Sequence, residues 1–171
     1  MTADDLGEAL HRYPVPMSEA AVLVRRATGD DAPELARLLT AFNAEYDAVI
    51  APLQVLEERF RTTLGGPDFM ALLAGTPAVG FATFSVRPSI YYDGRVALLE
   101  DLYVTPARRN EGIGAALVTR LMAIAREEGW GQLEIQVDEP DVDAMRFYAR
   151  QGFTMHDATT GDRALLWWRE F

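Results

Sequence analysis

Three apolar runs separated by short turns constrain the fold of this chain most strongly. Residues 69–74 and 79–86 are joined by a Gly-Thr-Pro turn, and an Asp-Gly turn leads into the third run, residues 96–104. Connections this short join strands that run in opposite directions, and Gly, Pro and Asp are typical turn residues. The sequence therefore predicts a three-stranded antiparallel meander in the middle of the chain.

Apolar residues at helical spacing predict helices on either side of this meander. In the first, Asp30 or Asp31 precedes an apolar face that includes Phe42 and Tyr46, which we therefore assign to the core. The helices are expected at residues 30–46, 53–64, 112–128 and 141–150, and further strands at residues 22–24, 133–137, 153–156 and 164–168. The predicted fold class is α+β, with a mixed, mostly antiparallel sheet of about six or seven strands flanked by about four helices.

Length and composition bound the domain organisation. The chain has 171 residues, 49% of them hydrophobic, which is enough for one core but short for two domains. Residues 1–18 have few periodic apolar positions, and Pro14 and Pro16 break any helix, so we expect a loosely ordered extension before a single domain over residues 19–171. No apolar stretch reaches the ~18 residues of a membrane span, and a signal-peptide layout is missing, so we expect a soluble, cytoplasmic protein.

Composition also excludes some kinds of chemistry. The chain has no cysteine, so disulfides, thiolate metal sites and a cysteine nucleophile are excluded. His11 and His156 lack metal-ligand spacing, and no metal is expected. The formal net charge of −10 disfavours nucleic acid as a partner. That charge is compatible with a cationic amine substrate, although a generally acidic surface explains it equally well.

A strand that leads through a basic, glycine-containing turn into a helix carries the clearest functional signal. The strand is residues 98–104, the turn is residues 105–111, and the helix begins near Gly112. The first N–H groups of a helix have no helical partner and the helix dipole is positive there, so this arrangement is typical of an anion site. A Rossmann fingerprint would need a small residue at Leu117, and a Walker loop would need Gly-Lys-Ser/Thr, so neither motif fits.

Two sequence blocks together resemble one acetyltransferase superfamily. The first is Arg109-x-x-Gly112-x-Gly114, which is similar to the pyrophosphate loop of the GCN5-related N-acetyltransferases (GNAT). The second is Asp141-x-x-Ala144-x-x-Phe147-Tyr148-x-x-x-Gly152-Phe153, in which Asp stands where the family usually has Asn. The resemblance spans residues 22–168 and implies the α/β-sandwich-like fold of that family.

The resemblance implies an N-acetyltransferase that moves an acetyl group from acetyl-CoA to a primary amine, expected to be that of a small molecule, by direct attack in a ternary complex. The backbone of Leu102 and Val104 would pair with the pantetheine arm as an added strand, and the amides of residues 109–115 would cradle the pyrophosphate. The implied cofactor-binding residues are Leu102, Tyr103, Val104, Arg108, Arg109, Asn110, Glu111, Gly112, Ile113, Gly114, Ala115, Asp141 and Tyr148. The Arg109 side chain is expected to contact phosphate, whereas for the Arg108 side chain phosphate contact and a solvated surface position both stay open.

The resemblance also implies two catalytic residues, Tyr148 and Glu100. Tyr148 would point its hydroxyl at the cofactor sulfur, but a tyrosine of pKa ~10 protonates a thiolate of pKa ~8.5 only uphill, so hydrogen bonding is the safer role. Glu100 lies on the cofactor strand, where strict alternation puts it on one face with Leu102 and Val104 and puts Asp101 on the other. Glu100 would act as base directly, through water, or only as an ion partner of an arginine, and Asp101 ranks below it.

The acceptor is expected between the first two helices and the hairpin around residue 91. Glu45, Asp47 and Tyr91 are candidate substrate-binding residues there. Short runs of this sequence resemble diamine and aminoglycoside acetyltransferases without naming a substrate. A protein N-terminal or lysine acetyltransferase and a non-enzymatic acyl-CoA-binding module are the alternatives. No nucleic acid or membrane partner is expected, and because the family often pairs through its last strands, Trp167 and Trp168 are candidate homodimer contacts.

Overall fold

The computed structural model describes residues 22–157, 159–165 and 169. Its helices follow the apolar periodicity of the sequence, and its strands follow the apolar runs. The strands are β1 (Val24–Arg26), β2 (Phe69–Ala74), β3 (Gly80–Pro88), β4 (Arg95–Val104) and β5 (Gln132–Ile135). The helices are α1 (Ala32–Ala44), α2 (Leu53–Thr63), α3 (Ile113–Glu127) and α4 (Val142–Arg150), with short 3-10 turns at Gly29–Asp31 and Pro106–Arg108.

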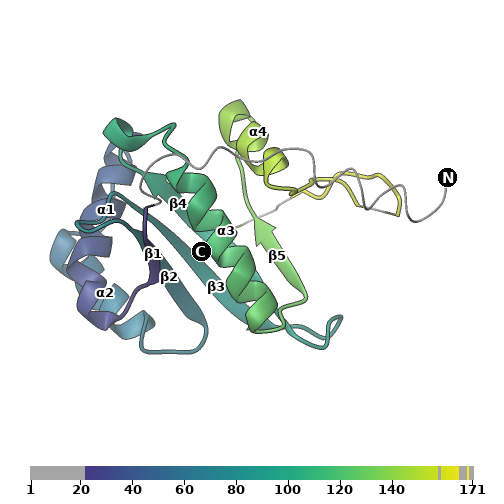
Figure 1. Ribbon diagram of the computed structural model, residues 1–171, viewed down its shortest axis with the longest axis horizontal. Helices are drawn as coiled ribbons and strands as arrows, with labels where there is room; N and C mark the ends of the chain where they lie inside the picture. Colours follow the sequence, from purple (N-terminus) through teal and green to yellow (C-terminus); the bar gives the residue numbers. More distant parts are fainter. Residues whose placement is uncertain (1–21, 158, 166–168, 170–171) are drawn as a thin grey trace.

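The strands form one sheet in chain order, β1-β2-β3-β4-β5 (Figure 1). The first four pair antiparallel, as the short turns predict, and β5 pairs parallel with β4 because α3 crosses over between them. The prediction of a mixed, mostly antiparallel sheet with four helices is confirmed, although the described residues form five strands where about six or seven are expected.

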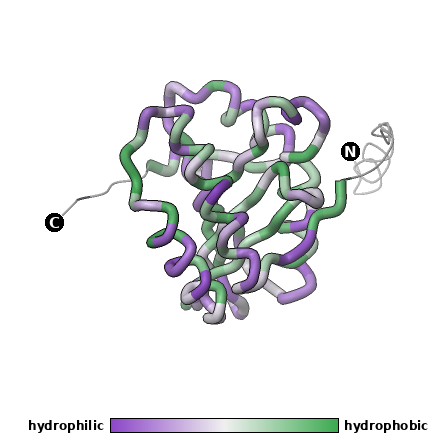
Figure 2. Tube along the Cα trace, turned by 90° about the vertical axis from the view of Figure 1, so that its left-hand side faces the viewer, coloured by the Kyte–Doolittle hydropathy of each residue, from purple (hydrophilic) through white to green (hydrophobic). Residues whose placement is uncertain are grey.

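The helices cover both faces of the sheet and divide the core in two. On one face, α1 and α2 pack over side chains that include Leu73, Phe81 and Tyr103. On the other face, α3 packs over a second cluster that includes Leu72, Phe84 and Leu99. Apolar residues follow the central strands, and hydrophilic ones gather on the outer helices and loops (Figure 2). Strand β4 therefore lies in the middle of the structure, with a core on either side.

Some expectations for the chain ends and for one helix are wrong or lie outside the described residues. The segment 153–156 is not a strand and makes only an isolated bridge, between His156 and Arg163. The strand expected at 164–168 lies partly outside the described residues, which omit 166–168. The expected extension of residues 1–18 lies entirely outside them, and so do Trp167, Trp168 and His11. Tyr46 is not in the core but 66% exposed, because α1 ends at Ala44 and Tyr46 lies in the following turn, whereas Phe42 does pack against the core.

Candidate active site

Strand β4 loses its neighbour on one side halfway along its length. It pairs with β5 only through four residues, Val96 to Leu99, opposite Gln132 to Ile135. From Glu100 to Val104, β4 pairs with no strand of the described residues other than β3. The backbone of this half of β4 therefore presents a free sheet edge, a form of surface to which an extended amide-bearing molecule can add as a strand.

A β-bulge lies where β4 becomes free. Leu99 lies opposite Phe84, but Asp101 lies opposite Thr83, so Glu100 is an extra residue in β4. Strict alternation predicts that Glu100 shares a face with Leu102, and this is wrong. Because of the bulge, Glu100 and Asp101 both lie on the face covered by α1 and α2, while Leu102 packs in the cluster under α3.

Two hydroxyls hold these adjacent carboxylates. Ser85 donates a 2.6 Å hydrogen bond to Glu100, and Thr83 donates one of 2.6 Å to Asp101. Burial raises the pKa of the Asp101 carboxyl and the neighbouring Glu100 charge raises it further, while the bond from Thr83 opposes the shift. Asp101, which the sequence ranks below Glu100, is thus the more enclosed of the two, and only the bulge could have indicated that the two carboxylates lie on the same face.

The turn between β4 and α3 presents a row of free amides. Asn110 and Gly112 have left-handed backbone conformations, with φ angles of 65° and 79°, and Gly112 is the residue before the first turn of α3. None of the backbone amides of residues 110–115 donates to a described residue, and Ala116 makes the first helical bond, to Gly112. A Cβ built on Gly112 meets nothing within 4 Å, so the space beside this turn is open. These features together make an anion cradle.

The arginine side chains of the turn bind protein groups. Arg108 pairs with Glu111 at 2.8 Å within the turn. Arg109 binds both carboxylate oxygens of Glu45, at 2.8 and 2.7 Å, and donates from Nε to the carbonyl of Val104 at 3.0 Å. The sequence predicts that the amides of residues 109–115 cradle a pyrophosphate. The amides of residues 110–115 are available as donors, whereas the amide of Arg109 donates to the carbonyl of Pro106.

Helix α4 brings the second sequence block against the first. Asp141 caps α4 by accepting a 2.9 Å bond from the amide of Ala144, as an Asp at that position should. A Cβ on Gly114 would lie 3.5 Å from the ring of Phe147, so the first turn of α3 packs against α4. The two motifs, far apart in the sequence, therefore meet where the first turn of α3 contacts Phe147 of α4.

Tyr148 lies on α4 beside the core cluster under α3. Its ring packs edge-on against Phe147 and Phe153, with centroids 5.0 and 5.8 Å apart. Its hydroxyl makes no hydrogen bond to any described side chain or backbone group. Burial, and then the charges of Asp141 and Asp101, raise the pKa of Tyr148 to about 12. The phenol is therefore protonated at any physiological pH and is able to donate a hydrogen bond.

The three candidate acceptor residues are not brought together. Glu45 follows α1 and is bound by Arg109, which holds the pKa of the Glu45 carboxyl below its usual range. Asp47 is two residues on, exposed, with a φ of 51°. Tyr91 is 86% exposed between β3 and β4, at the end of β4 remote from the anion cradle. Only Glu45 therefore contacts the residues of the cradle.

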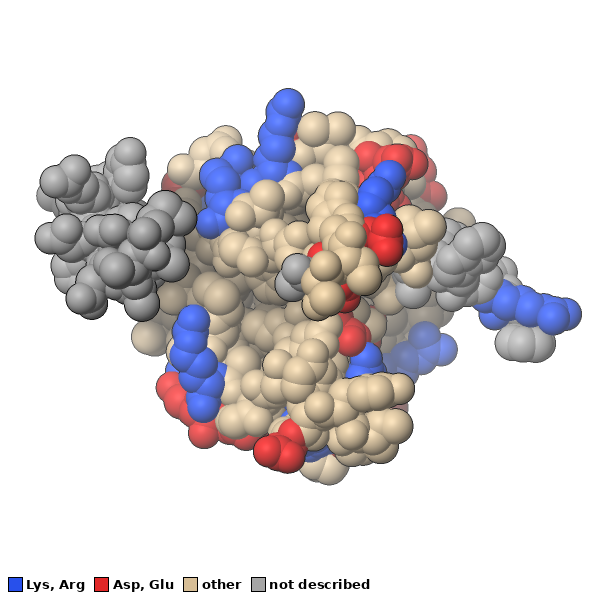
Figure 3. All heavy atoms as spheres, turned by 90° about the vertical axis from the view of Figure 1, so that its right-hand side faces the viewer, with Lys and Arg blue, Asp and Glu red and all other residues tan. Residues whose placement is uncertain are grey.

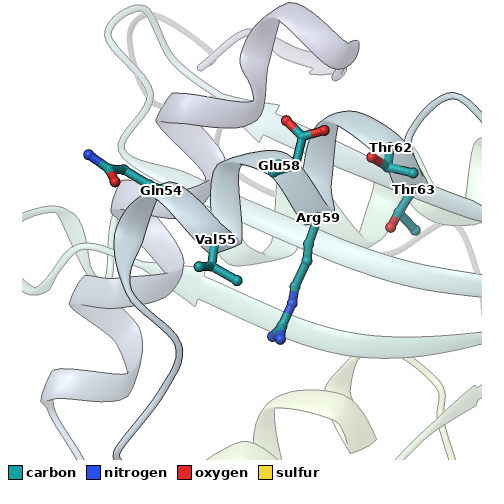
Figure 4. Close-up of a pocket in the computed structure, with 6 residues that line it drawn as sticks. All are labelled: Gln54, Val55, Glu58, Arg59, Thr62 and Thr63. Carbon is teal, nitrogen blue, oxygen red and sulfur yellow. The ribbon is translucent and has the colours of Figure 1, made fainter.

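The surface on the α4 side is mainly uncharged in the middle, with arginines and carboxylates around its rim (Figure 3). A shallow surface hollow lies elsewhere, on α2, where it is lined by Gln54, Val55, Glu58, Arg59, Thr62 and Thr63 (Figure 4). All six side chains come from a single helix at the other end of the sheet from α4 (Figure 1). This hollow is therefore separate from the cradle and its catalytic candidates.

No helix among the described residues is long and apolar enough to cross a membrane. Among the same described residues, no group of three or more His, Cys, Asp or Glu side chains could hold a metal ion.

Sequence comparison gives a family match over most of the chain. The model of the Acetyltransferase (GNAT) family matches residues 35–153, from α1 to just beyond α4. Bovine thialysine N-epsilon-acetyltransferase (Bos taurus) is 29% identical over 145 residues, covering 78% of this chain and 84% of that protein. An aminoglycoside N(6')-acetyltransferase type 1 of Stenotrophomonas maltophilia is 30% identical over 141 residues, covering 80% of this chain and 89% of that protein.

Structural comparison agrees. A crystal structure of a protein from Arthrobacter sp. FB24, proposed to be an acetyltransferase, superposes with a TM-score of 0.84 at 40% identity, covering 90% of this chain and 99% of that one. An aminoglycoside acetyltransferase from an uncultured soil metagenomic sample, in complex with sisomicin, superposes with a TM-score of 0.73 at 22% identity, covering 88% and 96%. The latter likeness concerns the fold alone.

Proposed function

The chain belongs to the GNAT family of acetyltransferases, and from that premise we propose that it transfers the acetyl group of acetyl-CoA to a primary amine of a small molecule, by direct attack in a ternary complex. That it is an acyltransferase enzyme follows from the family and from its named relatives. The cofactor, the acceptor class and the residue roles are the proposal.

The observation that carries the proposal is the row of amides at residues 110–115, which donate to no described residue and lie beside the free edge of β4. A diphosphate needs several N–H donors at close range, and the open space at Gly112 allows it to approach the backbone. The free edge from Glu100 to Val104 offers strand-like hydrogen bonds to the amides of a pantetheine arm. The residues present therefore fit acetyl-CoA, which when bound supplies an activated acetyl thioester.

Tyr148 is proposed to stabilise the leaving thiolate by donating a hydrogen bond. With a pKa of about 12, it is a weaker acid than a thiol of pKa ~8.5 by roughly 3.5 units, or about 5 kcal/mol, so complete proton transfer is disfavoured. A donor that keeps its proton and is held by two ring contacts can still stabilise charge that develops on sulfur.

Glu100 and Asp101 are proposed to attract the amine and to help remove its proton. An ammonium of pKa ~10.4 and a glutamate of pKa ~4.3 differ by roughly 6 units, or about 8 kcal/mol, so direct transfer to an ordinary carboxylate is strongly uphill. Glu100 is exposed and reaches water, which favours a relay through solvent. Asp101 lies deeper and adds negative charge at the same place.

Support for a small-molecule acceptor comes from the named relatives, which are thialysine and aminoglycoside acetyltransferases. The acidic pair on the face of β4 covered by α1 and α2 is consistent with a cationic acceptor of that kind. Neither observation distinguishes a diamine from an aminoglycoside.

The test is the release of free CoA thiol from acetyl-CoA in the presence of polyamines, aminoglycosides, amino acids and short peptides. Turnover with one class of small amine, weakened in Tyr148→Phe, is the expected result. Turnover with peptides alone would replace the small-molecule acceptor by a protein one. Tight binding of acetyl-CoA, with no thiol release above the uncatalysed rate on any amine, would overturn the proposal in favour of a binding module.

Cytoplasmic location and pairing into a homodimer are also proposals, which rest on the sequence. Light scattering after gel filtration tests the second, and a mass of one chain, 19.0 kDa, would contradict it.

A further inference from the structure

The strongest unassigned feature is a polar link between the cradle and the end of α1. Arg109, in the turn before α3, binds both oxygens of Glu45, which is 64 residues earlier in the chain. The same guanidinium donates to the carbonyl of Val104 at 3.0 Å and lies 5.8 Å from the centre of the Tyr103 ring. Isolated surface ion pairs contribute little to stability. A pair in which both carboxylate oxygens are bound, and which belongs to a network, restrains the two side chains more effectively.

Glu45 has a local reason to need this arginine. It occupies the C-terminal cap position of α1, where the helix dipole is negative and a carboxylate is unfavourable. The last turn of α1 contains no basic residue. Arg109 therefore supplies, from another part of the chain, the positive charge that the end of α1 lacks.

The link continues into the aromatic core. Tyr103 packs 5.5 Å from Phe42 of α1 and 6.0 Å from Phe81 of β3. Arg109 therefore joins the turn before α3 to the part of α1 that is already packed on β4. The chain then leaves α1 through residues 46–52, whose first amides bond back to the end of the helix, as Tyr46 and Ala48 do to the carbonyl of Asn43.

We propose that Arg109 is a positioning residue that, through Glu45, couples the cofactor cradle to the segment after α1, so that binding of acetyl-CoA orders residues 46–52. The inference rests on the proposed function, because it takes the amides of residues 110–115 as the diphosphate site. In this proposal the Arg109 side chain binds Glu45 and not phosphate. The Glu45 carboxylate correspondingly binds Arg109 and not the amine. An ordered cradle holds Arg109, and Arg109 holds the end of α1.

Hydrogen exchange of the segment after α1 tests the coupling without knowledge of the acceptor. Saturating CoA should slow exchange of the Tyr46 and Ala48 amides by fivefold or more in the natural chain. This effect should be lost in Glu45→Gln and in Arg109→Gln, while CoA affinity measured by calorimetry stays within about threefold. Glu58→Gln, which breaks the exposed Arg61–Glu58 pair on α2, is the matched control and should keep the full effect.

The charge swap Glu45→Arg with Arg109→Glu separates this role from direct ligand binding. Positioning predicts that the swap recovers at least part of the CoA-induced protection that each single charge reversal removes. CoA binding with no protection of residues 46–48 in the natural chain would overturn the coupling. Loss of CoA affinity above tenfold in Arg109→Gln, with none in Glu45→Gln, would make Arg109 a phosphate ligand instead. Failure of the natural chain to bind CoA would defeat the proposed function itself.

Discussion

The hydroxyl of Thr83 donates a 2.6 Å hydrogen bond to Asp101 across the two central strands, at the point where β4 bulges. This bond holds the side chain of Asp101, whose ionisation is disfavoured by burial. Burial raises the folded pKa of Asp101, so its charged form destabilises the folded state at neutral pH, and stability is gained as the pH falls through that pKa.

Asp101→Asn should therefore separate activity from stability. The amide oxygen still accepts from Thr83, and the costly charge is removed, so the melting temperature at pH 7 should equal or exceed that of the natural chain. The KM for a cationic amine should rise about tenfold, roughly the effect of one lost charge contact, 1.4 kcal/mol. Calorimetry and steady-state kinetics measure the two effects, and a clear fall in melting temperature would show that the charge stabilises the fold.

Tyr148→Phe should reduce kcat by about a hundredfold, the effect of removing one transition-state hydrogen-bond donor, with CoA affinity nearly unchanged. Because the pKa of Tyr148 is about 12, its titration should not appear in the rate profile between pH 6 and 10. The natural chain and the variant should have profiles of the same shape. Tyr92→Phe, which loses a hydroxyl bonded to Gln132 near the start of β4, is the control and should keep full kcat.

Asp31→Asn should lower the free energy of unfolding by about 1 kcal/mol at pH 7, the order of a lost hydrogen-bonded pair. Asp31 binds Arg25 through both oxygens and accepts from the Thr28 amide, and the bond from Arg25 lowers its pKa to about 2. A depressed pKa means that this stabilisation is complete above the unfolded value of ~3.9 and is lost as the pH falls through about 2. Urea unfolding at pH 7 and at pH 2.5 measures this loss. An equal difference between the two chains at both values would contradict it.

Much of the fold could be predicted because the turns and helix periodicities are local signals. The four helices and the meander of residues 69–104 follow from them directly. The bulge at Glu100 could not be predicted, because β4 has a core on both faces and shows no polar alternation, with Leu98 and Leu99 adjacent, from which a one-residue shift could be recognised.

The site shows the same division. The cradle amides lie where the glycine spacing predicts, since the backbone conformation of Gly112 is a local requirement. The pairing of Arg109 with Glu45 depends on how α1 packs on β4, and a separation of 64 residues in the sequence carries no sign of it. Local patterns therefore locate the amides that are proposed to bind the diphosphate, whereas the partners of the charged side chains depend on tertiary packing.

The two ends of α3 allow a controlled test of the cradle. Gly112 at its start and Gly129 just after its end both have left-handed conformations, with φ angles of 79° and 68°, and a Cβ on either meets nothing within 4 Å. An alanine at either position therefore costs only backbone strain, about 1–2 kcal/mol, and both variants should unfold at similarly reduced urea concentrations. Only Gly112→Ala places a methyl group in the open space beside the amides of residues 110–115, so it should weaken CoA binding by tenfold or more, while Gly129→Ala binds normally. Equal CoA affinities in the two variants, measured by calorimetry at matched folded fractions, would show that these amides do not hold the diphosphate.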